Sequence, residues 1–122
     1  MSSVLVTGGA GFIGSHLCEA LLSQGARITC LDDLSTGRVG NVAHLLAEPG
    51  FAFVQGDVAD PGVWDRLPAA RRVFHLASPA SPEDYQAAPV QTIRTNVVGT
   101  LNALGFARTH QARVLLTSTS EV

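Results

Sequence analysis

The stretch Val4-Leu-Val-Thr-Gly-Gly-Ala-Gly-Phe-Ile-Gly14 decides the fold. A short β-branched, apolar run leads into a glycine-rich turn, and a helical apolar pattern follows. Gly9, Gly11 and Gly14 satisfy the spacing G-x-G-x-x-G, and Gly8, Gly11 and Gly14 satisfy the wider G-x-x-G-x-x-G. Glycine permits the tight turn and lets the backbone approach a pyrophosphate, which free amides at a helix N-terminus then hold. The stretch therefore predicts a strand, a phosphate-binding turn and a helix.

Outward from this stretch, short apolar runs alternate with longer segments of helical periodicity, which is typical of βαβ units around a parallel sheet. We expect strands at residues 4–7, 27–31, 51–55, 72–76 and 113–117. We expect helices at residues 12–23, 40–47, 61–67 and 89–109, the last from an apolar row at Val90, Ile93, Val97, Leu101 and Leu104. Right-handed crossovers then predict an α/β, Rossmann-type doubly wound parallel sheet with strand order 3-2-1-4-5.

The composition narrows the class of protein. The 122 residues are 46% hydrophobic and 15% charged with a net charge of −2, which gives no basic footprint for nucleic acid. No signal-peptide pattern or bilayer-length apolar run is present, so we expect a cytoplasmic protein without a membrane partner. Cys18 and Cys30 lack metal-ligand spacing and lie in apolar segments, so they are interpreted as buried thiols rather than a redox or metal site.

A carboxylate after the second predicted strand strengthens the case for a dinucleotide. Asp32 follows Gly14 by 18 residues, where an acid can accept hydrogen bonds from the adenosine ribose hydroxyls. Its charge would repel a 2′-phosphate, so the pattern favours NAD over NADP. The alternative is a glycine-rich tight turn with a helix-capping aspartate. Asp33 either assists at the ribose or caps the following turn.

Polar residues also follow the third and fourth predicted strands, at the edge where such sheets bind ligand. Asp57 either accepts from the adenine amino group or serves as a turn residue. Leu76, Ala77 and Ser78 are placed to line the pyrophosphate and the nicotinamide ribose. His75 is interpreted as a packed strand histidine rather than an acid or base.

With these residues in place, the chain resembles the extended short-chain dehydrogenase/reductase family of nucleotide-sugar enzymes, and within it the UDP-glucuronate decarboxylases. The general motifs are Thr7-Gly-Gly-Ala-Gly-Phe-Ile-Gly-Ser-His16 and Asn96-Val-Val-Gly-Thr100. The more specific ones are His75-Leu-Ala-Ser-Pro-Ala-Ser-Pro82 with Tyr85, and Ser118-Thr-Ser-Glu-Val122. The resemblance runs across nearly the whole chain and also implies that a full-length relative forms a homodimer.

The resemblance implies a set of cofactor and substrate residues. Those expected to contact NAD are Gly11, Phe12, Ile13, Asp32, Thr36, Gly37, Asp57, Val58, Leu76, Ser78, Thr95 and Thr117. Those expected on the substrate side of the long helix are Arg94, Asn102, Gly105 and Arg108. Arg94 stands where the family usually has lysine, and Asp33 where it more often has asparagine. At about 100° per residue, Arg94, Gly105 and Arg108 share one face, although solvated surface arginines are the alternative.

The resemblance also implies a reaction. Hydride transfer from C4 of the sugar of UDP-glucuronate to NAD gives a 4-keto sugar, which decarboxylates readily, and return of the hydride gives UDP-xylose. Thr119 matches the hydroxyl that bonds the C4 oxygen. Ser120 and Glu121 match a pair near C5 and the carboxylate. The alternative is that residues 118–120 only end a strand and cap a helix.

The central base of this reaction is expected to be missing. The family uses a Tyr-x-x-x-Lys pair, whereas Tyr85 is the only tyrosine and all eight basic residues are arginines. We therefore expect residues 1–122 to form an incomplete NAD-binding domain that ends after the fifth strand, lacks the C-terminal substrate domain and does not turn over alone. The alternatives are a 4,6-dehydratase or 4-epimerase of the same family, or a catalytically silent NAD-binding sensor or scaffold.

Overall fold

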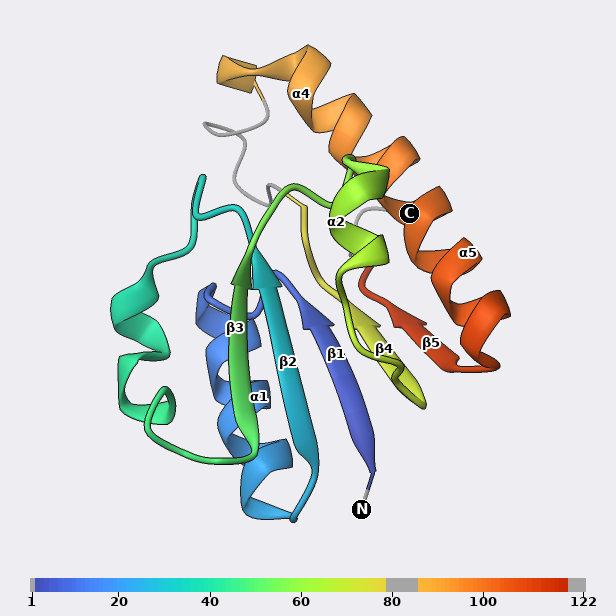
Figure 1. Cartoon of the computed structure of the whole chain (residues 1–122). Coiled ribbons are helices and arrows are strands. Elements are labelled where there is room, and N and C mark those ends of the chain that lie inside the picture. Colours follow the sequence, from blue (N-terminus) through green and yellow to red (C-terminus); the bar gives the residue numbers. More distant parts are fainter. Residues whose placement is uncertain (1, 79–85, 119–122) are drawn as a thin grey trace.

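Five parallel strands form the centre of the molecule. The computed structural model describes residues 2–78 and 86–118. The strands are β1 (Ser3–Thr7), β2 (Arg27–Asp32), β3 (Phe51–Gln55), β4 (Arg72–His75) and β5 (Arg113–Leu116). They pair in the order β3-β2-β1-β4-β5 (Figure 1). The predicted Rossmann-type order is confirmed, and every predicted strand boundary lies within one residue of the observed one.

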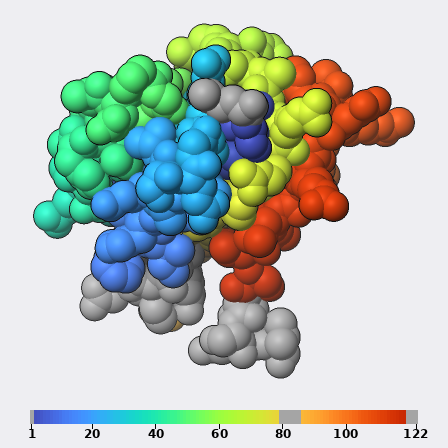
Figure 2. All heavy atoms as spheres, turned by 90° about the horizontal axis from the view of Figure 1, so that it is seen from below, coloured from blue at the N-terminus to red at the C-terminus, as the bar shows by residue number. Residues whose placement is uncertain are grey.

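Helices cover both faces of this sheet. On one face lie α1 (Phe12–Ser23) and the 3₁₀ turns η1 (Val39–Asn41) and η2 (Ala43–Leu45), and on the other lie α2 (Pro61–Asp65) and α5 (Thr100–His110). The helix α4 (Pro89–Arg94) lies past the carboxyl ends of the strands and buries none of its residues (Figure 1). Residues of α1 and η2 pack in one buried cluster together with Val42, which lies between η1 and η2, and residues of α2 and α5 pack in another. Seen from below in Figure 2, the colours run from green through blue and yellow to red across the molecule, which follows the strand order. Along the described residues, no helix has both the length and the apolar character that crossing a bilayer requires.

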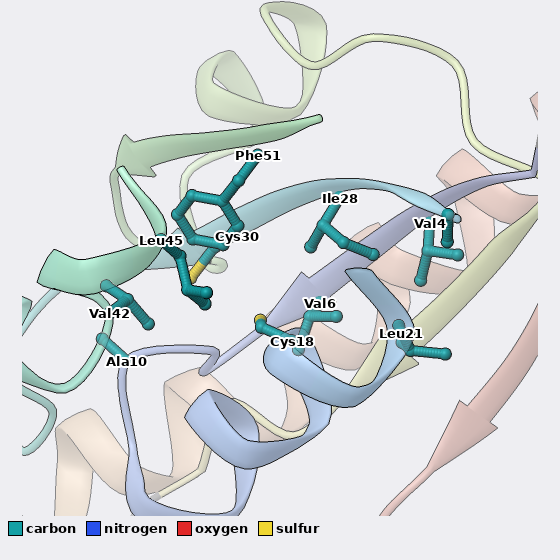
Figure 3. Close-up of a cluster of buried hydrophobic side chains, with 11 residues drawn as sticks. Val4, Val6, Ala10, Cys18, Leu21, Ile28, Cys30, Val42, Leu45 and Phe51 are labelled. Carbon is teal, nitrogen blue, oxygen red and sulfur yellow. The ribbon is translucent and has the colours of Figure 1, made fainter. Parts of the chain in front are cut away.

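The core follows the alternation of the central strand. Val4 and Val6 point into the cluster that contains Cys18 and Cys30 (Figure 3). Leu5 belongs to the cluster on the opposite face. Side chains of a strand alternate between faces, and both faces are covered here, so β1 is apolar at every buried position up to Thr7. This double burial places the end of β1 firmly beneath the glycine-rich turn.

The helix predicted over residues 40–47 is wrong. The structure has two short 3₁₀ turns there, η1 and η2. Val42 and Leu45 are the residues of this segment that reach the core, and they are three positions apart. A spacing of three suits the three-residue period of a 3₁₀ turn, so the segment buries its two apolar side chains without a full α-helix.

The long helix predicted over residues 89–109 is interrupted by η3, a π-helical turn over Thr95–Gly99 that separates α4 from α5. Gly99 lies against Val58, and an added Cβ would stand 2.6 Å from Val58 Cγ2. The apolar row that predicted this helix is exposed, with exposed fractions of 50–78% for Val90, Ile93, Val97, Leu101 and Leu104. The buried face instead carries Ala103, Phe106 and Ala107.

Candidate functional site

The glycine-rich turn is packed so closely that an added Cβ would collide at several of its glycines. Gly8 has φ +71°, and an added Cβ would stand 2.9 Å from the backbone of Leu76 and Ala77. At Gly14 the Cβ would stand 2.2 Å from the Gly8 carbonyl oxygen. Helix α1 begins directly after Gly11, and no side chain caps its first amides. The turn therefore presents free N–H groups and the positive end of the helix dipole, which together suit an anion.

Asp32 joins the end of β2 to this turn. Its carboxylate accepts hydrogen bonds from the Ala10 amide at 3.0 Å and the Leu34 amide at 2.8 Å, and the residue is 7% exposed. Burial raises the pKa of Asp32, the two amides oppose that rise, and the charge of Asp33 adds to it. An added Cβ at Gly37 would lie 2.8 Å from Asp32 Oδ2, so the loop passes close against the carboxylate.

Asp33 caps its own turn, which was one of the two predicted alternatives. Its Oδ1 accepts hydrogen bonds from the amide and the hydroxyl of Ser35, at 2.9 and 2.8 Å. Asp33 also lines the cavity at this edge of the sheet, so its alternative role at the adenosine ribose stays a prediction.

A cavity of about 1070 Å³ is lined by residues that follow the strands and by residues of α4. Figure 1 shows α4 past the carboxyl ends of the strands. This volume is at the upper limit of ordinary ligand pockets, roughly 300–1,000 Å³. Most of the predicted cofactor residues line it: Gly8, Gly11, Phe12, Ile13, Gly14, Asp32, Asp33, Thr36, Val58, Leu76, Ala77, Ser78, Thr95 and Thr117. A smaller hollow of about 300 Å³ near Arg71 and His110 lies at the amino ends of the strands, away from this edge.

Several lining residues were not predicted as cofactor contacts. They are Ser35, His75, Gln91, Thr92, Asn96, Thr100, Leu116 and Ser118. Gln91, Thr92 and Asn96 alternate along the helix with the exposed apolar row, and that polar face was the signal available in the sequence. Thr100 gave no such signal, because its direction depends on the π-turn that precedes it.

Gly37 and Asp57 do not line the cavity. Asp57 Oδ1 accepts from the Ala59 amide at 2.9 Å, which matches the predicted turn role, and Oδ2 lies 3.8 Å from Arg94 Nη1. This ion pair links the loop after β3 to α4. Both side chains are partly exposed, so the pair contributes modestly to stability, about 1 kcal/mol or less.

The residues predicted on the substrate side are spread over three environments. Arg94 pairs with Asp57, and Asn102 Nδ2 donates to the Val58 carbonyl oxygen at 2.9 Å. Gly105 faces open space, and Arg108 is exposed. The prediction that these residues share one face assumed 100° per residue along a continuous α-helix. The π-helical turn over Thr95–Gly99 changes the direction of the side chains that follow it relative to those before it. Their role toward a substrate stays a prediction.

His75 is a packed strand histidine, as expected, with 2% of its surface exposed. Its Nδ1 lies 2.7 Å from the Thr7 hydroxyl and its Nε2 lies 3.4 Å from the Thr100 hydroxyl. Burial lowers the pKa of His75, which keeps the ring neutral at physiological pH. The side chain therefore links β1, β4 and α5 behind the cavity.

Both cysteines lie behind the glycine-rich turn as buried free thiols (Figure 3). An added Cβ at Gly9 would stand 2.4 Å from Cys30 Sγ and 3.2 Å from Cys18 Sγ. The hydrogen bond to Cys18 and burial raise the pKa of Cys30, so its thiolate is strongly disfavoured. This confirms the interpretation of buried packing thiols. Within residues 2–78 and 86–118, no cluster of three or more His, Cys, Asp or Glu residues has the geometry to hold a metal ion.

The predicted catalytic residues Thr119, Ser120 and Glu121 lie outside the described residues, as do the segment 79–85 and its Tyr85. The nearest described residue is Ser118, and the hydroxyl of the preceding Thr117 donates to the His75 carbonyl oxygen at 3.4 Å. Thr117 and Ser118, which follow β5, both line the cavity.

A glycine-lined turn before α1, an acid at the end of β2 and a cavity across the central strands define a dinucleotide-binding Rossmann domain. Residues 4–122 match the model of the NAD dependent epimerase/dehydratase family, and the chain belongs to this family. The chain is 50% identical over 119 residues to UDP-glucuronic acid decarboxylase 2 of Arabidopsis thaliana, with 98% of the chain and 26% of that relative covered. The chain thus spans about a quarter of the length of this relative.

Solved structures of the family have the same fold. An epimerase of Methanothermobacter thermautotrophicus superimposes with a TM-score of 0.89 at 32% identity, over 98% of this chain and 35% of that one. A UDP-glucose 4-epimerase of Stenotrophomonas maltophila was solved with bound NAD and formylated UDP-arabinopyranose. It superimposes with a TM-score of 0.86 at 30% identity, over 100% of this chain and 38% of that one. NAD is the cofactor for which the family is named.

Proposed function

We propose that these residues bind NAD and form the cofactor-binding part of a nucleotide-sugar-modifying enzyme. The observation that carries the proposal is the cradle before α1, where added Cβ atoms at Gly8 and Gly14 would collide with backbone. The glycines let the turn pack closely against the end of β4 and the start of α1, and the first amides of α1 have no side-chain cap, so they are available to a pyrophosphate. The cavity volume and the buried acid at the end of β2 fit the rest of a dinucleotide.

The chain's own residues would orient the dinucleotide. Gly11 and the first amides of α1 would hold the pyrophosphate, and Asp32 would accept from the adenosine ribose hydroxyls. Each oxygen of Asp32 already accepts one amide, and carboxylate oxygens have further lone pairs for a ribose. A 2′-phosphate would meet the negative charges of Asp32 and Asp33, which favours NAD over NADP.

We further propose that the complete enzyme decarboxylates UDP-glucuronate. The support is the identity of 45–50% to UDP-glucuronic acid decarboxylases of plants and vertebrates over 98% of the chain. Bound NAD would supply reversible hydride acceptance at C4 of the sugar. Thr119, Ser120 and Glu121 would stand around the sugar, with the Thr119 hydroxyl toward the C4 oxygen.

A 4-epimerase is the second candidate, favoured by solved neighbours that are named as 4-epimerases, at TM-scores of 0.84–0.87. Residues 1–122 contain no lysine. The Tyr-x-x-x-Lys pair that the family resemblance implies is therefore not among them. We propose accordingly that this stretch of chain binds NAD without turning over substrate.

Calorimetry on the purified chain tests the proposal, with NAD and NADP titrated into wild type, Asp32→Ala and Asp65→Ala. Asp65 is an exposed aspartate of α2 outside the cavity, so its substitution removes the same charge without touching the site. We expect NAD to bind more tightly than NADP, and Asp32→Ala to lose at least tenfold in NAD affinity while Asp65→Ala keeps it.

Circular dichroism of each variant separates loss of binding from loss of fold. If the folded wild-type chain does not bind NAD, or binds NADP more tightly than NAD, the cofactor proposal is contradicted. Adding UDP-glucuronate to the NAD complex and assaying released carbon dioxide tests the absence of turnover, and any catalytic release contradicts it.

A further inference from the structure

A chain of hydrogen bonds runs from β1 through His75 to the cavity. The Thr7 side-chain oxygen accepts the amides of Leu76 and Ala77 at 3.1 and 3.2 Å. The same hydroxyl lies 2.7 Å from His75 Nδ1, and His75 Nε2 lies 3.4 Å from the Thr100 hydroxyl. Thr7 and His75 are almost completely buried, and His75 and Thr100 both line the cavity.

The positions of the protons follow from counting donors and acceptors. A hydroxyl has two lone pairs and one proton. The Thr7 side-chain oxygen accepts a hydrogen bond from the Ala77 amide and shares the Leu76 amide with the Thr7 backbone carbonyl oxygen, which also lies 3.1 Å from the Leu76 nitrogen. Among the described residues, His75 Nδ1 is the remaining partner of this hydroxyl, so the Thr7 proton is assigned to that contact and Nδ1 is the acceptor. A neutral imidazole then carries its proton on Nε2 and donates it to Thr100.

The π-turn gives Thr100 an unusual direction for a helical threonine. Thr92 in α4 and Thr109 in α5 donate their hydroxyl protons to carbonyl oxygens four residues earlier, Ala88 at 2.9 Å and Gly105 at 3.0 Å. Thr100 directly follows η3 and, within the described chain, its hydroxyl shows no such bond. Since Thr100 accepts from His75, its own proton is left to point into the cavity.

We propose that the Thr100 hydroxyl is a hydrogen-bond donor to an acceptor oxygen on the nicotinamide-ribose half of the bound dinucleotide, with His75 as the residue that positions it. This inference rests on the proposed NAD binding. The location of Thr100 assigns it to the nicotinamide half of the dinucleotide. Thr100 contacts His75, which ends β4 on one side of β1. Asp32, the expected partner of the adenosine ribose, ends β2 on the other side of β1. A dinucleotide spans these two sides of such a sheet.

Matched substitutions in one helix test the role of Thr100. Thr100→Val removes the hydroxyl and keeps the shape, Thr100→Ser restores a hydroxyl, and Thr109→Val makes the same change at an exposed site of α5. Binding of NAD and of ADP, which lacks the nicotinamide half, is measured for each. We expect about a tenfold loss of NAD affinity in Thr100→Val, the size of one lost hydrogen bond. ADP binding should stay unchanged, Thr100→Ser should recover most of the loss, and Thr109→Val should match wild type.

The role of His75 has its own measurement. Proton–nitrogen correlation spectra of the wild-type imidazole should show the neutral form protonated at Nε2, which a merely packed ring need not adopt. Protonation at Nδ1 instead would overturn the proposal that His75 donates to Thr100 and positions its hydroxyl. If wild type binds NAD and Thr100→Val binds it equally well, the Thr100 contact is wrong while the proposed NAD function stands. If wild type binds no NAD, both fail.

Discussion

Gly14→Ala should have two opposing effects on the free energy of unfolding, a gain from helix propensity and a loss from packing. Gly14 is the third residue of α1, where alanine by propensity alone would stabilise the helix by up to about 1 kcal/mol. The added Cβ, however, would stand 2.2 Å from the Gly8 carbonyl oxygen and 2.7 Å from Gly9 Cα. Real Cβ atoms essentially never approach closer than 3.0 Å, so the backbone of the turn must move by most of an ångström.

The magnitude follows from these two opposing effects. Inserting atoms into a packed region costs about 1–3 kcal/mol, and the upper end applies because the colliding atoms are backbone. After the propensity gain, we expect Gly14→Ala to lower the free energy of unfolding by about 2 kcal/mol. NAD affinity should fall by more than tenfold in the same variant, because the displaced turn is the proposed pyrophosphate cradle.

Urea unfolding and NAD calorimetry measure the two effects, with Gly105→Ala as the control. Gly105 lies inside α5, and an added Cβ there meets no atom within 4 Å. Gly105→Ala should therefore raise the free energy of unfolding by up to about 1 kcal/mol and leave NAD binding unchanged. If Gly14→Ala is as stable as Gly105→Ala, or binds NAD like wild type, the steric reasoning is refuted.

Two further predictions concern His75 and Asn102. Because burial lowers the pKa of His75 below its unfolded value of 6.5, the unfolded chain binds the extra proton as the pH falls, and stability falls with it. Between pH 7.5 and 5.5, one such proton lowers the free energy of unfolding by at most about 1.4 kcal/mol. Urea unfolding of wild type against His75→Gln isolates this loss, since the opposite contribution of Asp32 is common to both, and equal pH dependence in the two would contradict it. Asn102→Ala should lower the free energy of unfolding by about 1 kcal/mol through its lost bond to the Val58 carbonyl, with NAD affinity unchanged. A drop in NAD affinity with unchanged stability would instead assign Asn102 to ligand binding.

The class of fold and the core of the site were predictable because their signals are local. A strand followed directly by a glycine-rich turn can be recognised from consecutive residues alone. Asp32 stands at a spacing from this turn that one βαβ unit sets. The five strands were found within one residue for the same reason, since turn residues bound each apolar run. The segment at residues 40–47 was predicted wrongly because two apolar side chains three apart fit a helix and a 3₁₀ turn alike.

The roles of the long helix could not be predicted from its own pattern. Its apolar row is exposed, while Ala103 and Phe106 meet the sheet, because packing against β4 and not periodicity selects the buried face. The π-turn at Thr95–Gly99 redirects Thr100 toward His75, and the sequence shows no mark of that turn.

The sequence by itself determined the parallel sheet, the glycine-rich turn and the acid that stands near it. Only the tertiary structure decided which polar side chains meet behind the cavity. Thr7 and His75 are 68 residues apart and become neighbours through the register of β1 with β4. Such contacts depend on how strands align and how helices rotate against them, and these depend on the packing of the whole core rather than on any local run of residues.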